Sequence, residues 1–376
     1  MADLLVLGAS FVGMSFAIAA HMEGFDVHLY DKAPKPALAN KAGANVIAVN
    51  PRSADFLDQI GVWELIPNEF VTPYKQISVF DGEGSGSISL GADEVGSSCL
   101  GFIVDQTALR VAMNERAISE GLEIRWGETA NTDSDQDQTG LLVAADGVNS
   151  ETRERLGIKK IGYSYGQRAT VCIVEFNSKL GNETSSQAYQ WFRGSGPLAL
   201  LPIGGRNKFA VVWSSSEDMG SKTENEFMSD LEEATERKLG RIARVSKRNS
   251  FPLIQQHALQ YAVPGAVLLG DAAHSIHPLA GQGANLGFAD ARCLVTELCA
   301  ARLEGRSSQD LRVLKRYERK RRTENHLAGV AMEGFHRIFT TNSSSVGVMR
   351  SSGLRFFNNN RVLKRLAIHI ASGHFW

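Results

Sequence analysis

The first 31 residues constrain the fold of this 376-residue chain more than any other segment. Residues 4–7 form a short apolar run, residues 11–22 an apolar stretch of helix length, and residues 27–30 a second apolar run that is closed by Asp31. This order predicts a strand, a helix and a second strand. We therefore expect the chain to open with a βαβ unit of an α/β sheet.

The turn before the predicted helix has the pattern of a dinucleotide-binding loop. Residues 8–13 read GASFVG, so Gly8 and Gly13 stand at the first and third glycine positions and Ser10 replaces the second glycine. Such a turn lets a pyrophosphate approach the helix N-terminus. Asp31 follows Gly8 by 23 residues, where an acid would bond a ribose diol. Taken alone, the motif also fits a glycine-rich turn without a ligand.

Composition excludes several classes of protein. The 40 Lys plus Arg nearly balance the 41 Asp plus Glu, which argues against a general nucleic-acid binder. No apolar run approaches the roughly 20 residues that span a bilayer, and Asp3 in the apolar N-terminal stretch argues against a signal peptide. Four cysteines without a CxxC pair suit a reducing compartment. We therefore expect a cytoplasmic protein.

The middle of the chain predicts a second sheet. Residues 74–100 have the pattern of hairpins, and residues 168–216 contain extended segments separated by turn residues, which is typical of an antiparallel sheet. Residues 224–239 form a charged amphipathic helix, and the chain after the glycines near 283 is mostly helical. Four aromatic residues on the predicted strands either roof an apolar pocket or pack in the core: Tyr189, Trp191, Phe192 and Trp213.

Residues 264–298 form the most specific segment. A buried strand ends at Gly270 and Asp271, where ligands collect on open α/β sheets. A helix begins directly behind the GQG of residues 281–283, and its free N–H groups suit an anionic group. His274 and His277 lie three residues apart, but a third metal ligand at helical spacing is missing. We therefore expect no metal site.

Three separated motifs resemble the FAD-dependent aromatic hydroxylases of the p-hydroxybenzoate hydroxylase-like group. They are LGASFVG with Asp31, AADGVNSETR at 144–153 and GDAAHSIHPLAGQGANLG at 270–287. Further sequence segments resemble the ubiquinone-biosynthesis subgroup: GPLALLPI at 196–203, FPLIQQHALQY at 251–261, YERKRRTEN at 317–325 and the segment at 353–373. The resemblance implies a Rossmann-like FAD-binding domain with an inserted antiparallel substrate domain and a C-terminal helical region.

The resemblance also implies roles for matching residues. Asp31 would bond the adenosine ribose and Asp271 the ribityl chain. The residues implied to bind the cofactor are Gly8, Ser10, Gly13, Asp31, Gln106, Asp146, Gly147, Arg153, Gly270, Asp271, Gly283, Ala284 and Asn285. The residues implied to line the flavin ring, where the chemistry takes place, are His277, Pro278, Gly281, Gln282 and Gly283.

Two features depart from the family pattern. Where the family often has an arginine that touches the flavin, this chain has Asn45, with Arg52 seven residues further on. The hairpin expected before the AADG strand is shortened to a polar tract at 128–139.

Charge is distributed unevenly along the chain. Residues 302–376 carry a net charge of +10, and residues 1–301 carry −11. Five apolar residues form one face of a short basic helix: Val362, Leu363, Leu366, Ala367 and Ile370. Such a helix either lies at an anionic membrane surface, which would place the protein peripherally at the inner membrane, or packs on its own domain or a partner subunit.

These patterns predict an enzyme with a divided FAD-binding domain. The expected boundaries are 1–73, 101–158 and 263–305 for the FAD-binding domain, 74–100 and 159–262 for the substrate domain, and 306–376 for the helical region. The resemblance implies that the enzyme hydroxylates a polyprenyl phenol or quinol of ubiquinone biosynthesis through a flavin hydroperoxide, with O2 and NAD(P)H as co-substrates. A ferredoxin-type donor, a soluble hydroxylase of small aromatics and a non-catalytic flavin-binding scaffold in a biosynthetic complex are the alternatives.

Overall fold

The structure, a computed structural model, describes residues 3–37, 45–130, 140–177, 182–205, 207–276, 282–341 and 344–373. Its N-terminal part contains a six-stranded sheet in the order β16-β17-β9-β1-β2-β8. β1 (Leu4–Leu7) pairs in parallel with β2 (Val27–Asp31) on one side and β9 (Leu141–Ala144) on the other, and α1 (Phe11–Met22) joins β1 to β2. The predicted opening βαβ unit is therefore confirmed.

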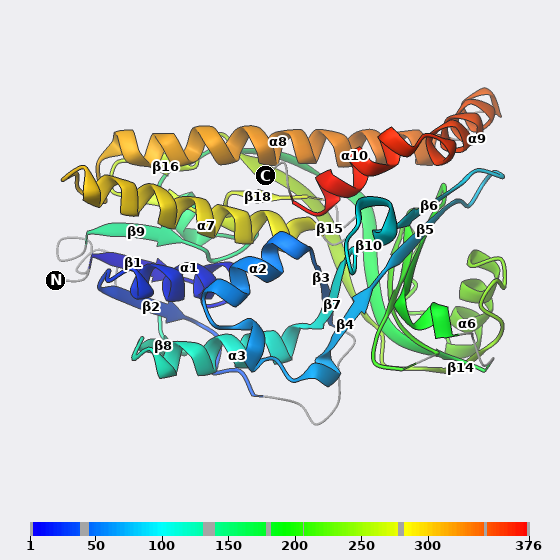
Figure 1. The fold of residues 1–376 in the computed structure, drawn as a ribbon, viewed down its shortest axis with the longest axis horizontal. Helices are drawn as coiled ribbons and strands as arrows, with labels where there is room; N and C mark the ends of the chain where they lie inside the picture. The colour runs from blue at the N-terminus through cyan, green and yellow to red at the C-terminus, as the bar shows by residue number, and fades with distance from the viewer. Residues whose placement is uncertain are drawn as a thin grey trace.

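Strands from distant parts of the chain complete this sheet. β8 (Ile124–Trp126) pairs in parallel with β2, β17 (Ala266–Leu268) pairs in parallel with β9, and β16 (Ala262–Val263) is an antiparallel edge strand. α3 (Gln106–Ser119) and α7 (Gln282–Leu303) both belong to the layers around the sheet, and α7 packs on α1. Figure 1 shows α8 (Leu311–Thr340) running above α7 and onward toward the second sheet.

The second sheet has nine strands and is mainly antiparallel, as the pattern of residues 168–216 predicts. β5 joins β11 in parallel, so the predicted hairpin of residues 74–100 forms one end of this sheet. Its strands are β5 (Gln76–Asp81), β6 (Ser87–Gly91), β10 (Lys160–Phe176), β11 (Gln187–Phe192), β12 (Leu198–Pro202), β13 (Lys208–Ser215), β14 (Ile242–Val245), β15 (Asn249–Ala258) and β18 (His274–Ser275).

One face of the second sheet forms a core with α6 (Glu224–Ala234). Tyr189, Trp191 and Trp213 belong to this core, and the ring centroid of Trp213 lies 5.8 Å from that of Phe227 in α6. Phe192 instead stacks on Phe339 of α8 at 4.1 Å. Of the two interpretations open from sequence, the core interpretation holds for Tyr189, Trp191 and Trp213. Phe192 lies on the opposite face of the sheet, because successive side chains of a strand point to opposite faces.

A three-stranded sheet connects the two large sheets. It consists of β3 (Val46–Val49), β7 (Gly101–Asp105) and β4 (Val71–Tyr74), and α2 (Pro51–Gln59) follows β3. Ala48 and Ile103 pack against Ile203 and Ala210, which lie in the region of the second sheet. The short elements are η1 (Trp63–Leu65), η2 (Asn68–Phe70), η3 (Ala92–Val95), α5 (Glu151–Arg155), η4 (Asn182–Ser186) and η5 (Gly270–Ala272).

The C-terminal region is helical, as predicted, and is tied to the second sheet. α9 (Ser344–Asn359) follows α8 and packs on β6. Nε of Arg350 donates to Oδ2 of Asp81 at 2.8 Å, and both side chains are buried. Breaking such a buried pair leaves an uncompensated charge and costs about 3–5 kcal/mol. Among the described residues, no helix is both long and apolar enough to cross a membrane.

The last helix, α10 (Arg361–Ala371), packs on its own chain through only part of its apolar surface. Ile368 is buried against Ala92 and Leu100, so one side of the helix packs on its own chain. Val362, Leu366 and Ile370 are exposed. The predicted apolar face is therefore shifted: the packed side includes Ile368, and an apolar stripe at i, i+4 and i+8 faces solvent.

Candidate functional site

Residues of the three sequence motifs lie at the ends of four neighbouring strands of the six-stranded sheet. β17, β9, β1 and β2 lie side by side and run in parallel. Gly270 and Asp271 follow β17, Asp146 follows β9, Gly8 follows β1, and Asp31 ends β2. Because parallel strands have their carboxyl ends at the same edge, the fold brings these motifs together at one edge of the sheet, where open α/β sheets bind ligands.

The turn after β1 is possible only with its two glycines. Gly8 has φ +103°, and a Cβ there would overlap the carbonyl oxygen of Ala145. A Cβ on Gly13 would overlap the carbonyl oxygen of Gly8, so α1 can approach the turn this closely only without that atom. Ser10 is exposed at the N-cap of α1, and its side chain makes no capping hydrogen bond.

Asp31 lies directly beside this turn. Its Oδ2 accepts a hydrogen bond from the backbone N–H of Ala9 at 2.6 Å, and its Oδ1 accepts one from the N–H of Ala33 at 2.7 Å. The two bonds fix the carboxylate between the loops that follow β1 and β2. Each oxygen keeps further lone-pair capacity, as an acceptor of ribose hydroxyls requires.

Asp146 and Arg153 have different surroundings. Oδ2 of Asp146 accepts from the N–H of Thr152 at 3.1 Å, whereas its buried Oδ1 has no hydrogen-bond partner in the described structure. Arg153 is buried and donates to the carbonyl oxygens of Ala272 at 2.9 Å and Val148 at 3.2 Å. Arg153 therefore ties the loop after β9 to the turn after β17, and Gly147 (φ +84°) permits the bend within the loop after β9.

Gln256 is a residue of this edge that the sequence motifs did not single out. It comes from β15 of the second sheet, is buried, and its Nε2 donates to the carbonyl oxygen of Val148 at 2.5 Å. It thereby ties the second sheet to the loop that follows β9. The only sequence signal was its place within FPLIQQHALQY, where nothing in the residue pattern distinguishes it from Gln255.

The N-terminus of α7 lies close to the same edge. Gly270 (φ +55°) lies against Val12, and so does Gly287 of α7. A Cβ on Gly283 would meet no atom of the described residues within 4 Å. The helix begins at Gln282, and its first N–H groups have no partner within the helix. His277, Pro278 and Gly281 lie outside the described residues, as does the side chain of Gln282.

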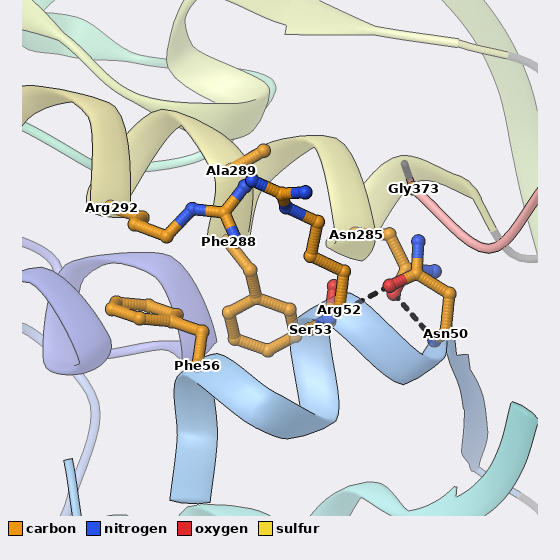
Figure 2. A pocket seen from close by; sticks show the side chains of 9 residues that line it. All are labelled: Asn50, Arg52, Ser53, Phe56, Asn285, Phe288, Ala289, Arg292 and Gly373. Carbon is orange, nitrogen blue, oxygen red and sulfur yellow. Dashed lines mark hydrogen bonds between the residues drawn. The ribbon is translucent and has the colours of Figure 1, made fainter. Parts of the chain in front are cut away.

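Asn285 and Gln106 hold the segment around β3. Asn285 is buried and donates to the carbonyl oxygen of Ala48 at 2.8 Å. It also accepts from the N–H of Asn50 at 2.9 Å, a bond drawn in Figure 2. Gln106 donates to the carbonyl oxygen of Val46 at 3.2 Å, and its N–H donates to the carbonyl oxygen of Asn45 at 3.0 Å. In this arrangement both side chains act on the backbone of residues 45–50.

Arg52 and Arg292 meet in a small pocket between α2 and α7. Figure 2 shows the two guanidinium groups beside one another, above Phe56 and Phe288. Burial lowers the pKa of Arg292, and the charge of Arg52 lowers it further. Arg52, the arginine nearest to Asn45 in sequence, therefore faces α7 from the first turn of α2, whereas Asn45 is exposed just before β3.

His274 belongs to a buried hydrogen-bonded cluster. Its Nε2 lies 2.6 Å from Oδ2 of Asp290, and both side chains are buried. Arg321 and Asn325 of α8 donate to the other oxygen of Asp290 at 2.7 and 3.0 Å. Within the described ranges, no group of three or more His, Cys, Asp or Glu is placed to hold a metal ion.

Known proteins share this architecture and sequence. The family model described as an FAD binding domain matches residues 1–328. The chain is 29% identical to 3-demethoxyubiquinol 3-hydroxylase of Escherichia coli, over 99% of this chain and 98% of that protein. It is 31% identical to ubiquinone hydroxylase UbiL of Rhodospirillum rubrum, over 99% of this chain and 90% of that protein.

Solved structures show the same fold at lower identity. The p-nitrophenol 4-monooxygenase PnpA of Pseudomonas putida superposes with a TM-score of 0.77 and 17% identity, over 98% of this chain and 96% of that chain. A variant of HpxO from Klebsiella pneumoniae, complexed with FAD, has a TM-score of 0.73 and 19% identity, over 99% of both chains. Together with the sequence motifs, these comparisons show that the chain belongs to the family of FAD-dependent monooxygenases that includes the ubiquinone-biosynthesis hydroxylases.

Proposed function

We propose that the protein hydroxylates the aromatic ring of a polyprenyl phenol or quinol intermediate in ubiquinone biosynthesis. The observation that carries this proposal is the full-length similarity to two ubiquinone-biosynthesis hydroxylases, combined with the three motifs at one edge of the six-stranded sheet. The substrate is an apolar aromatic compound, and O2 is the second substrate. FAD, when bound, supplies the oxygen-activating chemistry.

The residues at the sheet edge fit an adenine dinucleotide. The turn from Gly8 to Gly13 gives a pyrophosphate access to the N-terminus of α1, and Asp31 can accept hydroxyls of the adenosine ribose. The buried Oδ1 of Asp146 is an acceptor without a donor in the described structure, so a ligand hydroxyl or a water is expected there. Asp271, which is exposed, is proposed to bond the ribityl chain.

Other residues orient the cofactor from the second half of the site. The N–H groups of Gly283 and Ala284 are proposed to donate to the pyrimidine edge of the ring, where the helix dipole favours negative charge. His277, Pro278, Gly281 and Gln282 are proposed to line the ring and to exclude water from it. Arg153, Asn285 and Gln106 hold the backbone that carries these contacts, and Gly270 and Gly147 give it the required bends.

We assign FAD binding and substrate binding to different segments of the chain. We propose that residues 1–73, 101–158 and 263–305 bind FAD, that residues 74–100 and 159–262 shape the substrate site, and that residues 306–376 form a helical region. NAD(P)H is proposed as the electron donor. Stopped-flow reduction of the bound flavin under anaerobic conditions by NADH, NADPH and a reduced ferredoxin tests the donor: reduction by the ferredoxin alone would contradict it.

The hydroxylation itself can be tested with isotopic oxygen. The purified FAD-loaded protein is incubated with NAD(P)H, 18O2 and a short-chain polyprenyl phenol, and the product is analysed by mass spectrometry. The proposal predicts one 18O atom in the ring of the product. Hydroxylation of small phenols without any conversion of prenylated ones would favour a soluble hydroxylase, and NAD(P)H oxidation without hydroxylation of any phenol would favour a non-catalytic scaffold.

A polyprenyl substrate resides in lipid, so we propose that α10 contacts a membrane surface. Val362, Leu366 and Ile370 form its exposed apolar stripe, and Arg361 and Arg365 each precede a residue of this stripe. An exposed apolar stripe beside basic residues suits an anionic bilayer, where each basic residue contributes about 1 kcal/mol. The wider basic charge contributes less, because Arg350 pairs with Asp81 and Lys364 with Glu94.

Vesicle binding tests this contact. Replacing Val362→Ser and Leu366→Ser together is expected to weaken co-sedimentation with phosphatidylglycerol vesicles at least fivefold. Leu303→Ser, which changes an exposed apolar residue at the end of α7, is the matched control and should leave binding unchanged. Equal vesicle binding by wild type and the double variant would contradict membrane contact through this stripe.

A further inference from the structure

A buried carboxylate behind the proposed cofactor edge links two of the segments that form it. Asp290 lies in α7, about two turns beyond Gly283, and its side chain is fully buried. Its Oδ2 accepts a hydrogen bond from the backbone N–H of Gly270 at 3.1 Å and contacts Nε2 of His274 at 2.6 Å. The same oxygen therefore contacts both sides of the turn that carries Asp271.

The other oxygen of Asp290 faces α8. Its Oδ1 accepts from Nε of Arg321 at 2.7 Å and from Nδ2 of Asn325 at 3.0 Å. Arg321 is itself buried and donates further to Oδ1 of Asn325 at 2.9 Å and to the carbonyl oxygen of Leu286 at 3.4 Å. Both oxygens are thus fully used, and the carboxylate joins the turn after β17, the first turns of α7 and the middle of α8.

The charge of Asp290 is stabilised by this arrangement. Burial by itself raises the pKa of the carboxyl group, but the charges and hydrogen bonds of His274 and Arg321 hold its pKa well below the usual range. A buried ionised group of this kind is costly unless it is fully paired. The carboxylate therefore depends on its four partners, and their hydrogen bonds hold it in a fixed geometry.

We propose that Asp290 is a positioning residue that sets the Gly270–Asp271 turn against the first turns of α7, and that Arg321 and Asn325 act through it. The inference rests on the proposed function, because that turn and that helix are the segments assigned to the ribityl chain and to the pyrimidine edge of FAD. The bond from Gly270 to Asp290 connects the two segments directly, so it fixes their separation independently of the chain between them.

The interface between α7 and α8 contains a second buried carboxylate, Glu297, which can be compared with Asp290. Glu297 lies seven residues beyond Asp290 on α7, is also buried, and pairs with Arg316 at 3.0 Å and Lys320 at 2.6 Å, both on α8. Like Asp290, it joins α7 to α8 by ion pairs. Unlike Asp290, it has no recorded hydrogen bond to the turn of residues 270–274 within the described structure. A purely structural ion pair should behave like Glu297.

The variants Asp290→Asn and Glu297→Gln therefore form a matched pair. An asparagine keeps the size of Asp290 but places an N–H2 group against donors on one side, so either Gly270 and His274 or Arg321 and Asn325 lose their acceptor. We expect both variants to unfold at lower temperature. Only Asp290→Asn is expected to weaken FAD binding to the apoprotein, by about tenfold or more in a fluorescence titration, and to shift the midpoint potential of the bound flavin.

Two further results keep this proposal separate from others. Asn325→Ala retains the ion pair of Asp290 with Arg321 and should weaken FAD binding only a few-fold. This milder variant serves for the measurement if Asp290→Asn does not fold. Unchanged FAD affinity and midpoint potential in Asp290→Asn, or an equal loss in Glu297→Gln, would overturn the positioning role. Failure of the wild-type protein to bind FAD would instead overturn the proposed function.

Discussion

The two large sheets use their side chains in opposite ways. In the six-stranded sheet, the polar groups collect at the carboxyl ends of the parallel strands, where Asp31 ends β2 and Asp146 and Asp271 follow β9 and β17. In the nine-stranded antiparallel sheet, large aromatic residues such as Trp191 and Trp213 collect on one face beneath α6. Candidate binding groups therefore lie at the ends of parallel strands, whereas Trp191 and Trp213 on the antiparallel strands form a core.

Removing a large aromatic residue from the second sheet is expected to have the largest effect on stability. Trp191 is completely buried and stacks between Phe80 and Tyr189, at centroid distances of 5.1 and 5.8 Å. Trp191→Ala should lower the free energy of unfolding by about 3–5 kcal/mol, measured by urea denaturation. FAD affinity of the folded protein should stay unchanged, and a parallel loss of FAD affinity would contradict the separation of the two regions.

Adding one methyl group at the turn after β1 should affect FAD affinity more than stability. Gly13→Ala places a Cβ against the carbonyl oxygen of Gly8, so α1 must move away from the turn. We expect FAD affinity to fall more than 100-fold, and stability to fall by about 1–3 kcal/mol. Titration of the apoprotein with FAD measures the first effect. Ala17→Gly, a change on the same helix away from the turn, is the control and should bind FAD as the wild type does.

The sequence predicts the parallel sheet and part of the candidate site. The βαβ opening and the meeting of Asp31 with the glycine turn follow from local patterns, because hydrophobic periodicity and glycine positions are readable along the chain. Asp146 and Asp271 are also recognisable from the sequence. Each follows a buried strand, and each belongs to a motif that resembles the family.

Other features of the site depend on contacts between distant residues. Gln256 and Asp290 act through hydrogen bonds to segments 108 and 20 residues away, and no local pattern marks them. The YERKRRTEN segment resembles the ubiquinone-biosynthesis subgroup, but its role in the fold depends on the hydrogen bonds that Arg321 and Asn325 donate to Asp290. For Trp191 and Trp213, alternation along a strand shows that they share a face but not which neighbour covers it.

A smaller, pH-dependent effect is expected where the two regions meet. His257 of β15 pairs with His274 of β18, and burial, together with the charges of His274, His326 and Arg322, lowers its pKa to about 4 despite the opposing charge of Asp290. Above pH 6.5 the imidazole is neutral in both states. Between about pH 6.5 and pH 4 the unfolded chain alone binds the proton, so stability falls as the pH falls, by roughly 1–3 kcal/mol.

The variant His257→Gln isolates this contribution. Its free energy of unfolding should fall less than that of the wild type between pH 7 and pH 4.5, measured by urea denaturation at each pH. Identical pH profiles for the two proteins would show that His257 is not held neutral in the folded state.

The central claim is that the carboxyl edge of the parallel sheet, and not the aromatic face of the second sheet, holds the flavin. The most direct measurement is the titration of apoprotein with FAD for the wild type, Asp271→Ala and Tyr189→Phe, followed by flavin fluorescence. We predict one FAD per chain in the wild type, at least tenfold weaker binding in Asp271→Ala and unchanged binding in Tyr189→Phe. Equal affinity in all three proteins, or weakening in Tyr189→Phe alone, would contradict the claim.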